Sequence, residues 1–248
     1  MFAAFARRYV DVLASIYIYN EHRGYTSLDR VLEAVRARCP DDAAFISAVE
    51  KHRADERRHY LMFRRYFERQ GRMPLAVDRT CGHIDHFIEI MFGRPIDTLD
   101  TGAIVADEAL FETLCRVIML TEQRGMKQVD ILLRSPIIRR DATLRQIFRV
   151  IARDEPSHWM PYRDWLARND RRPPRWWERL IDVRIHRELM LLRLPLLFLN
   201  WRMARRGAWP DAGERGATAP DGRLQSGKSG LGSAIGAGEE GSARGTLA

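Results

Sequence analysis

The sequence has little cysteine, little lysine and few of the alternating apolar stretches that indicate strands. Its three cysteines, Cys39, Cys81 and Cys115, lie far apart, and none belongs to a CxxC pair, which argues against a zinc ribbon or a rubredoxin-like iron site. Residues 1–22 lack the charged-then-apolar order of a secretory signal. An odd cysteine count without such a signal predicts free thiols in a reducing compartment, so we expect a cytoplasmic protein.

The positive charge of the chain is mainly that of arginine. Lysine and arginine together number 41 against 33 acidic residues, which gives a net charge of +8. A basic excess of this kind is typical of proteins that bind nucleic acid or anionic lipid. Here the arginines are spread along helical faces and flank apolar segments without a compact basic block, so we expect no nucleic-acid partner.

Apolar residues recur at three- and four-residue intervals almost throughout, which predicts an all-α fold. Turn signals such as "CPDD", "GRMP", "RSP" and "NDRRPP" divide the pattern. The predicted helices are residues 3–38, 41–70, a shorter one within 81–92, 101–133, 141–168 and 176–206. Four long helices with one long crossover predict a bundle over residues 1–170, followed by an amphipathic helical segment over 171–206. Residues 207–248 are rich in Gly, Ala, Ser and charge, and we predict a disordered tail there.

Two motifs each occur twice in the predicted bundle. "NEHRGY" and "TEQRGM" share Glu-x-Arg-Gly, while "ADERRHY" and "RDEPSHW" share Asp-Glu-x-x-His followed by an aromatic residue. The copies are offset by 101 residues for the first motif and by 99 for the second. The motifs supply six residues with metal-binding side chains: Glu21, Glu56 and His59 in the first half, and Glu122, Glu155 and His158 in the second. A single Glu-x-x-His would mean little, but the paired repeat is a strong signal.

The spacing of these residues predicts that they meet. Glu21 and Glu56 are centred on position 38.5, within the first predicted turn, and Glu122 and Glu155 are centred on 138.5, within the second. Residues equidistant from the turn of an antiparallel hairpin lie at the same height, because each helix rises about 1.5 Å per residue. The i, i+3 spacing places each carboxylate and its imidazole on one helix face.

Packing of the two hairpins would therefore bring four carboxylates and two imidazoles together in the interior. Unpaired buried carboxylates are costly, and divalent metal ions would compensate them. Four Glu and two His are the ligand set of di-iron and di-manganese carboxylate bundles. Oxygen-rich sites with one imidazole per metal suit iron or manganese better than structural zinc, so we expect two iron ions, with manganese as the alternative.

On these motifs, residues 4–168 resemble ferritin-like di-iron carboxylate proteins. The resemblance implies bridging roles for Glu56 and Glu155, terminal roles for Glu21 and Glu122, and one iron ion each for His59 and His158. The first Asp-Glu-x-x-His copy, which contains Arg58, is also similar to the Asp-Glu-x-Arg-His motif of bacterial multicomponent monooxygenases. That likeness implies that Asp55 and Asp154 each orient a ligand histidine of the partner helix. The second copy departs from it, with Pro156 and Ser157 where the motif has Arg at the latter position.

The resemblance further implies a di-iron oxidase or oxygenase that uses dioxygen to hydroxylate or oxidise a small organic substrate. An external reductase would supply the electrons, because the chain has no redox domain of its own. The alternative is a ferritin-type iron-binding protein with ferroxidase activity. Three features argue against a ferritin-type storage cage: the doubled Asp-Glu-x-x-His motif, the long crossover and the additional C-terminal segment.

Three residues within the predicted helices leave alternatives open. Pro156 removes a backbone donor at a cost of roughly 3 kcal/mol inside a helix, and it either shapes the metal face or is a tolerated kink. Gly24 and Gly125 each lie one turn from a predicted ligand. They serve either close helix packing or space for dioxygen or substrate.

The segment "WWERLIDVRIHRELMLLRLPLLFLNWRMARR" is apolar, with Trp and Arg at both ends. Its apolar core is too short to span a bilayer, and Arg193 and Pro195 interrupt it. Flanking Trp and Arg are typical of a helix that lies in the membrane interface, which predicts peripheral membrane contact and a lipophilic substrate. The alternatives are packing on the bundle and a homodimer contact.

Overall fold

The computed structural model describes residues 2–212 of the 248-residue chain. This part of the chain is helical, and its β-structure amounts to an isolated bridge between Leu75 and Arg205. The all-α prediction is confirmed. All three cysteines are free, as predicted, and Cys81 and Cys115 are buried.

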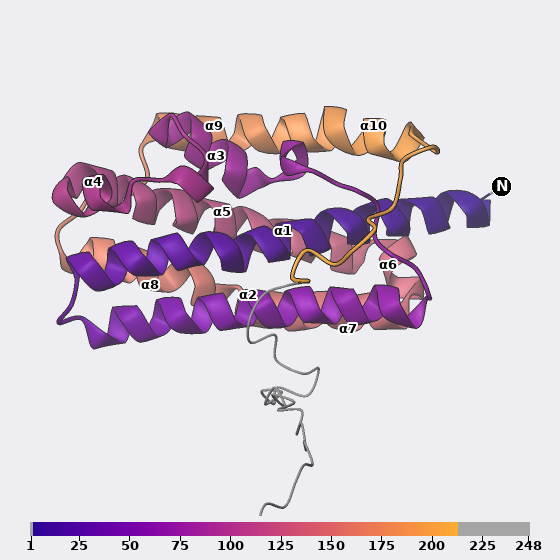
Figure 1. Ribbon diagram of the computed structural model, residues 1–248, viewed down its shortest axis with the longest axis horizontal. Coiled ribbons are helices and arrows are strands. Elements are labelled where there is room, and N and C mark those ends of the chain that lie inside the picture. The colour runs from indigo at the N-terminus through magenta and orange to yellow at the C-terminus, as the bar shows by residue number, and fades with distance from the viewer. Residues whose placement is uncertain (1, 213–248) are drawn as a thin grey trace, which may run out of the picture. The chain divides into compact units, whose positions relative to one another are not determined.

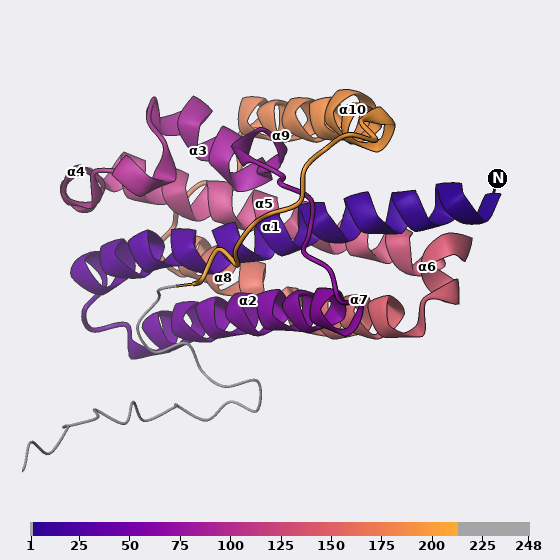
Figure 2. The ribbon, with the colours of Figure 1, turned by 45° about the vertical axis from the view of Figure 1, so that its right-hand side comes forward.

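Four long helical segments lie side by side (Figures 1 and 2). They are α1 (Phe2–Arg38), α2 (Ala43–Arg69), α5 (Glu108–Arg134) and the consecutive pair α7 (Ala142–Asp154) and α8 (Pro156–Arg168). Helices α1 and α2 form the first hairpin, and α5 forms the second with α7 and α8 across the short α6 (Pro136–Arg140). The hairpins contact each other chiefly where α2 meets α7 and α8.

Aspartate side chains fix the beginnings of the long helices. Asp42 accepts a hydrogen bond from Phe45 N at 3.0 Å at the start of α2, and Asp141 accepts one from Leu144 N at 2.9 Å at the start of α7. Such a cap satisfies a backbone N–H that the first helical turn leaves without a partner.

The same kind of cap divides one predicted helix in two. Residues 101–133 were predicted as one helix, but the chain forms α4 (Thr101–Ala106) and then α5. Asp107 separates them, because its carboxylate accepts hydrogen bonds from Ala109 N at 2.8 Å and Leu110 N at 3.3 Å. A capping aspartate between two apolar-periodic segments therefore starts a new helix.

The predicted helix 141–168 is also interrupted, at Glu155. Pro156 is the first residue of α8, a position whose backbone N–H would have no partner inside the helix. The penalty of a proline in a helix interior therefore does not apply to Pro156. His158 N donates to Glu155 O at 2.9 Å, so the new helix begins within the motif itself. Pro161, by contrast, lies inside α8.

The crossover and the C-terminal segment cover one face of α1 and α5 (Figure 1). The crossover contains the 3-10 turns η1 (Arg79–Cys81) and η2 (Ile96–Thr98), the helix α3 (His83–Phe92) and α4. The C-terminal segment consists of α9 (Trp176–Glu188), a π-helical turn η3 (Leu189–Arg193) and α10 (Leu194–Leu199). Helices α3 and α9 contact each other and α5, and α10 contacts α1.

The C-terminal helix and the tail differ in extent from the prediction. The helix was predicted to reach Arg206 but ends at Leu199, and the chain then runs beside the crossover, where Ala76 N donates to Ala204 O at 2.9 Å. The tail was predicted from residue 207, yet Trp209 is half-buried, with the Arg64 guanidinium 5.1 Å from its ring centre. Residues 213–248 of the predicted tail lie outside the described residues.

Two apolar clusters fill the space between the four long segments. One includes Leu28, Val49, Phe111 and Tyr162, and the other includes Ile18, Phe63, Val129 and Phe148. In α2, α5 and the α7–α8 pair the motif glutamate falls between the two clusters in sequence, and in α1 Glu21 lies between Ile18 and Leu28. The polar cluster therefore forms a layer with tightly packed apolar side chains on either side of it.

Candidate metal centre

The motif residues of the first hairpin converge on one point. Glu21 on α1 and Glu56 and His59 on α2 are all buried. Glu21 Oε2 lies 3.2 Å from His59 Nδ1, and Glu56 Oε1 lies 3.9 Å from the same nitrogen. These three residues offer donor atoms close enough together to hold a single metal ion.

The motif residues of the second hairpin approach the same carboxylate. His158 Nδ1 is 3.3 Å from Glu56 Oε1, and it lies 3.9 Å from Glu122 Oε2 and 3.9 Å from Glu155 Oε2. The structure thus brings together all six residues that the repeat singled out. Glu56 reaches both histidines, as a bridging carboxylate would, whereas Glu155 lies near His158 alone.

Each of the two motif histidines is held by an aspartate of the opposite hairpin. His59 Nε2 is 3.2 Å from Asp154 Oδ2, and His158 Nε2 is 3.4 Å from Asp55 Oδ2. These contacts leave the Nδ1 atom of each ring directed at the glutamates. The crossed pairing matches the orienting role that the resemblance implies for the two aspartates, since such contacts fix ring orientation at metal sites.

Arg58 joins the two halves of this outer layer. Its guanidinium donates to Asp154 Oδ2 at 2.6 Å and lies 2.9 Å from Asp55 Oδ1. In the second motif Ser157 occupies the corresponding position, and Lys51 reaches it instead, donating to Ser157 Oγ at 3.0 Å and also to Asp55. A lysine from α2 thus supplies the positive charge that the second motif lacks.

His52 is a member of the cluster that the repeat did not predict. It is 1% exposed, and its Nε2 lies 3.6 Å from Glu122 Oε1 and 3.9 Å from Glu56 Oε1. Its ring stacks on that of His158 with the centroids 4.2 Å apart. Together with Glu56, Glu122 and His158 it forms a second group of potential metal-binding atoms. The available signal was its position four residues before Glu56, one helical turn away on the same face.

Burial raises the pKa values of Glu21, Glu122 and Glu155. Burial and the neighbouring Glu56 raise the pKa of Glu21 to about 7. Burial raises the pKa of Glu122, and burial together with Glu122 raises that of Glu155 well above its usual range. These shifts arise mainly because the protein interior solvates a carboxylate poorly, and repulsion from neighbouring carboxylates adds to them at Glu21 and Glu155.

The pKa values of the histidines shift in opposite directions: those of His59 and His158 are raised, and that of His52 is lowered. Burial alone would lower the pKa of His59 and of His158, but the contacts of His59 with Glu21 and of His158 with Asp55 and Glu56 raise both values. Burial and the positive field of His158 hold the pKa of His52 well below its usual range. His52 therefore stays neutral, which is the form in which an imidazole binds a metal.

The cluster fits divalent metal ions on the chemistry of its unpartnered atoms. Buried atoms without a hydrogen-bond partner include one carboxylate oxygen of Glu21 and of Glu155, Nδ1 of His59 and His158, and both ring nitrogens of His52. Buried polar atoms are nearly always satisfied in folded proteins, so a concentration of unsatisfied ligand atoms in one layer needs an explanation. Divalent cations would satisfy these atoms and neutralise the carboxylates together.

The two glycines of the Glu-x-Arg-Gly motifs make room for carboxylates. A Cβ atom at Gly24 would lie 2.2 Å from Glu56 Oε2, and one at Gly125 would lie 3.2 Å from Glu155 Oε1. In both cases the nearest atoms belong to a carboxylate side chain of the partner helix, which is the close helix packing of the first alternative.

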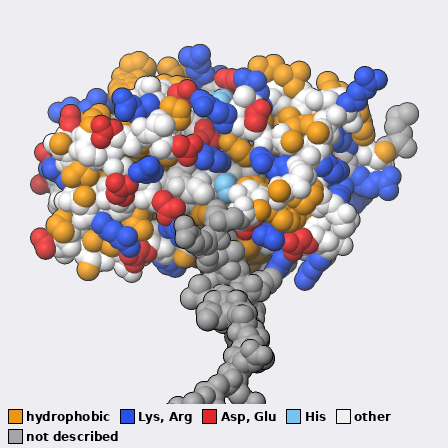
Figure 3. Space-filling model, viewed as in Figure 1, with side chains coloured by type: hydrophobic (Ala, Val, Ile, Leu, Met, Phe, Trp, Pro, Cys, Tyr) orange, Lys and Arg blue, Asp and Glu red, His pale blue; other side chains and the backbone are white. Residues whose placement is uncertain are grey.

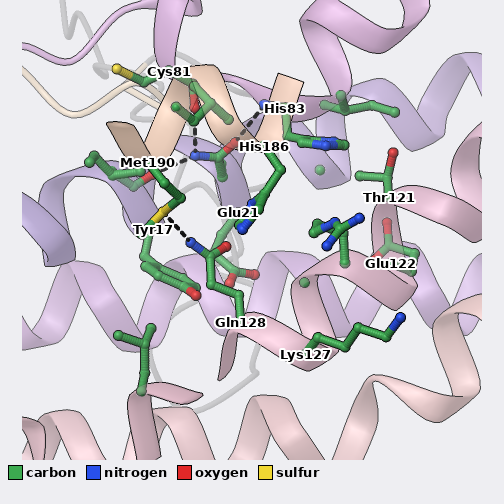
Figure 4. Close-up of a pocket in the computed structure, with 18 of the residues that line it drawn as sticks. Tyr17, Glu21, Cys81, His83, Thr121, Glu122, Lys127, Gln128, His186 and Met190 are labelled. Atoms are coloured by element: carbon green, nitrogen blue, oxygen red, sulfur yellow. Dashed lines mark hydrogen bonds between the residues drawn. The ribbon is translucent and has the colours of Figure 1, made fainter. Parts of the chain in front are cut away.

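A cavity of about 270 Å³ adjoins the cluster (Figure 4). Its lining includes all four glutamates and comes from α1, α2, α5, α7–α8, the crossover and the C-terminal segment. Apolar side chains such as Leu13, Ile118 and Leu189 make up most of the remaining wall. At one end Gln128 donates to Met190 Sδ at 3.4 Å and so ties α5 to η3.

Neither a protein-family model, nor a curated protein, nor a solved structure matches this chain. The assignment of the site therefore depends on the residues and geometry described above.

Proposed function

We propose that this chain is a di-iron oxidase or oxygenase built on a ferritin-like four-helix bundle. One observation carries the proposal: two groups of ligand atoms share Glu56, leave buried donor atoms without partners, and border a largely apolar cavity. A purely structural cluster would have no need of a cavity that reaches its carboxylates.

The proposal gives each cluster residue a part in holding two metal ions. Glu21 and His59 would hold the first ion, while Glu122, His158 and His52 would hold the second. Glu56 would bridge the two ions, and Glu155 would add a carboxylate from the cavity side. Two iron ions bound there would supply the reduction of dioxygen that drives oxidation of an organic substrate. Manganese is the alternative metal for the same donor set.

The chain's own side chains prepare this chemistry in three ways. The crossed aspartates fix the imidazole rings so that Nδ1 faces the carboxylates. The apolar clusters on both sides of the polar layer exclude water and keep the local dielectric constant low. The cavity would hold a small and mainly apolar organic substrate against Glu21 and Glu122. Electrons would come from a separate reductase.

Anaerobic titration with Fe(II) tests the metal assignment. We expect two equivalents per chain, and loss of most of one equivalent in His59→Ala and in His158→Ala. His86→Ala is the matched control, because His86 lies on α3 outside the cluster. Full wild-type occupancy in both cluster variants would contradict the assignment. A parallel titration with Mn(II) determines which metal the site prefers.

Exposure of the loaded protein to air separates an oxidase from a ferritin-type ferroxidase. An oxidase or oxygenase without its reductant should consume oxygen once, in proportion to the two bound Fe(II) ions. A ferroxidase would continue to oxidise Fe(II) added beyond two equivalents. Sustained oxidation of excess Fe(II) would therefore favour iron handling over the function proposed here.

A further inference from the structure

Helix α9 buries two acidic side chains and exposes two large apolar ones. Its buried side includes Glu178 and Asp182, which are 0% and 4% exposed, while Trp176 and Leu180 are 77% and 59% exposed. A surface helix in water normally turns its apolar stripe toward the core and its charges outward. The outer face of α9 thus combines these exposed apolar side chains with the exposed Arg179, Arg184 and Arg187, and this combination indicates a contact surface that is partly apolar and partly basic.

The two buried acids of α9 act as internal ties and contribute no charge to the outer face. Glu178 accepts hydrogen bonds from the buried Arg116 Nε at 3.0 and 3.1 Å. Asp182 accepts from Arg124 and lies 3.2 Å from His83 Nε2. These contacts anchor α9 to α5 and α3, so the outward position of Trp176 and Leu180 follows from a well-held helix.

The apolar surface continues along the rest of the C-terminal segment. Seven of the eleven large exposed hydrophobic residues in the described part of the chain lie between residues 176 and 201. They are Trp176, Leu180, Leu191, Leu192, Leu196, Leu199 and Trp201. In Figure 3 orange apolar side chains and blue basic ones gather along the upper edge of the molecule, where Figure 1 places α9 and α10. Such a concentration marks an interaction surface.

Nearly all of the net charge of the protein belongs to this same segment. Residues 171–206 contain ten arginines and three acidic residues, a net charge of +7 out of +8 for the whole chain. Two of the three acids are the buried partners of Arg116 and Arg124, and the third, Glu188, is paired with Arg193. Arg171 and Arg205 pair with Glu108 and Asp11 outside the segment. The exposed side thus combines leucine and tryptophan with the remaining arginines.

We propose that the outer face of α9, η3 and α10 docks on an anionic lipid surface. No helix among residues 2–212 is long and apolar enough to cross a membrane, so this contact is interfacial. Leucine and tryptophan enter the boundary between headgroups and acyl chains, and the arginines bind the lipid phosphates. A second copy of the chain fits this face poorly, because a twofold contact sets the patch against itself and opposes two segments of charge +7.

The proposal is independent of the metal centre, and flotation with lipid vesicles tests it. The full-length chain is mixed with vesicles of phosphatidylcholine alone or with one quarter phosphatidylglycerol, in about 0.1 M salt. We expect binding to the anionic vesicles, little binding to the neutral ones, and weaker binding at 0.5 M salt, because salt screens the lipid charge. A wild-type chain that fails to float with anionic vesicles overturns the proposal.

Two sets of substitutions separate the apolar contribution from the charge contribution. The first set is Leu191→Ser, Leu196→Ser and Leu199→Ser, at positions that are 76%, 54% and 67% exposed. The side chains are exposed, so the substitutions leave the core intact, and we expect the vesicle partition coefficient to fall by about a hundredfold or more. Unchanged circular dichroism and metal content verify the fold.

The second set is a matched comparison of charge. Arg179→Gln, Arg184→Gln and Arg187→Gln lower the charge of the face by three, and they should reduce binding to anionic vesicles by at least about tenfold. The control variant carries Arg65→Gln, Arg69→Gln and Arg149→Gln, exposed positions on α2 and α7 that make the same change in net charge. Equal losses in both variants would show non-specific attraction and overturn the docking face. If the wild-type chain is a dimer and the leucine substitutions convert it to a monomer, the face binds a second copy of the chain and the lipid proposal is wrong.

Discussion

Replacement of Gly24 by alanine separates the folding of this protein from the metal binding proposed for it. Glycine in a helix interior is less favourable than alanine by about 1 kcal/mol, so the substitution should strengthen α1. The new Cβ would, however, lie 2.2 Å from Glu56 Oε2. Ordinary contacts of this kind begin at 3.4 Å, so the Glu56 carboxylate has to retreat by about 1.2 Å.

That retreat is large on the scale of a coordination bond. Carboxylate oxygens bind divalent metals at about 2.0–2.2 Å, so a ligand displaced by more than half of that length no longer coordinates. Glu56 is the carboxylate common to both groups of ligand atoms. We therefore expect Gly24→Ala to lower the affinity for both metal ions by more than about tenfold. A loss of that size already follows when only the residues that contact the metal ligands are changed.

Gly125→Ala is the matched control because it makes the same change in the second half of the repeat. Its Cβ would lie 3.2 Å from Glu155 Oε1, which asks for a shift of only about 0.2 Å. Urea denaturation of the metal-free proteins should show both variants at least as stable as the wild type, with Gly125→Ala the more stable. Titration with Fe(II) under anaerobic conditions should show weak binding in Gly24→Ala alone. Equal metal affinities in the two variants would refute the bridging position of Glu56.

Three further substitutions test separate parts of the structure. His52→Ala should lower the affinity for one of the two metal ions by about tenfold or more and leave the affinity for the other unchanged. Equal affinity for both ions in this variant would exclude His52 as a ligand. Pro156→Ala should change the free energy of unfolding in urea by less than about 1 kcal/mol, since the first helical position needs no N–H; a gain near 3 kcal/mol would show a proline under strain. Asp182→Asn should destabilise the protein at pH 7 by about 2 kcal/mol through loss of its charged hydrogen bonds. Burial alone would raise the pKa of Asp182, but His83 and Arg124 outweigh it and lower that pKa, so the difference between wild type and variant should be full above about pH 4 and shrink as the pH falls below it. A difference that grew on acidification would contradict this assignment.

The repeat in the sequence was sufficient to predict which six side chains meet. It succeeded because symmetric positions about a helical turn have equal heights, and that relation requires no knowledge of the packing between hairpins. The same symmetry hid His52. Its counterpart 99 residues later is Ile151, an apolar core residue, so a search for repeated residues passes over it. A departure from the repeat can thus contribute to the site as much as the repeat does.

Helix boundaries were predicted less well where one side chain decides between two conformations. The apolar periodicity runs through Asp107 and through Glu155, and it gave no sign that Asp107 caps α5 or that Pro156 opens α8. The cavity could not be predicted at all. Its walls come from segments as distant as Leu13 and Met190, and only the packing of the C-terminal segment over α1 and α5 encloses it.

The two groups of ligand atoms have different origins in the chain, and this difference sets an order of assembly. The group of Glu21, Glu56 and His59 comes entirely from α1 and α2, which the ribosome completes well before α5 exists. The group with Glu122 and His158 forms only after the two hairpins have docked on each other. During synthesis the first hairpin can thus capture a single ion, while a pair of ions has to await the final docking. The proposed dioxygen chemistry, which requires two neighbouring ions, would thereby be withheld from every unfinished chain, and the nascent protein would be protected from the oxidant formed by that chemistry.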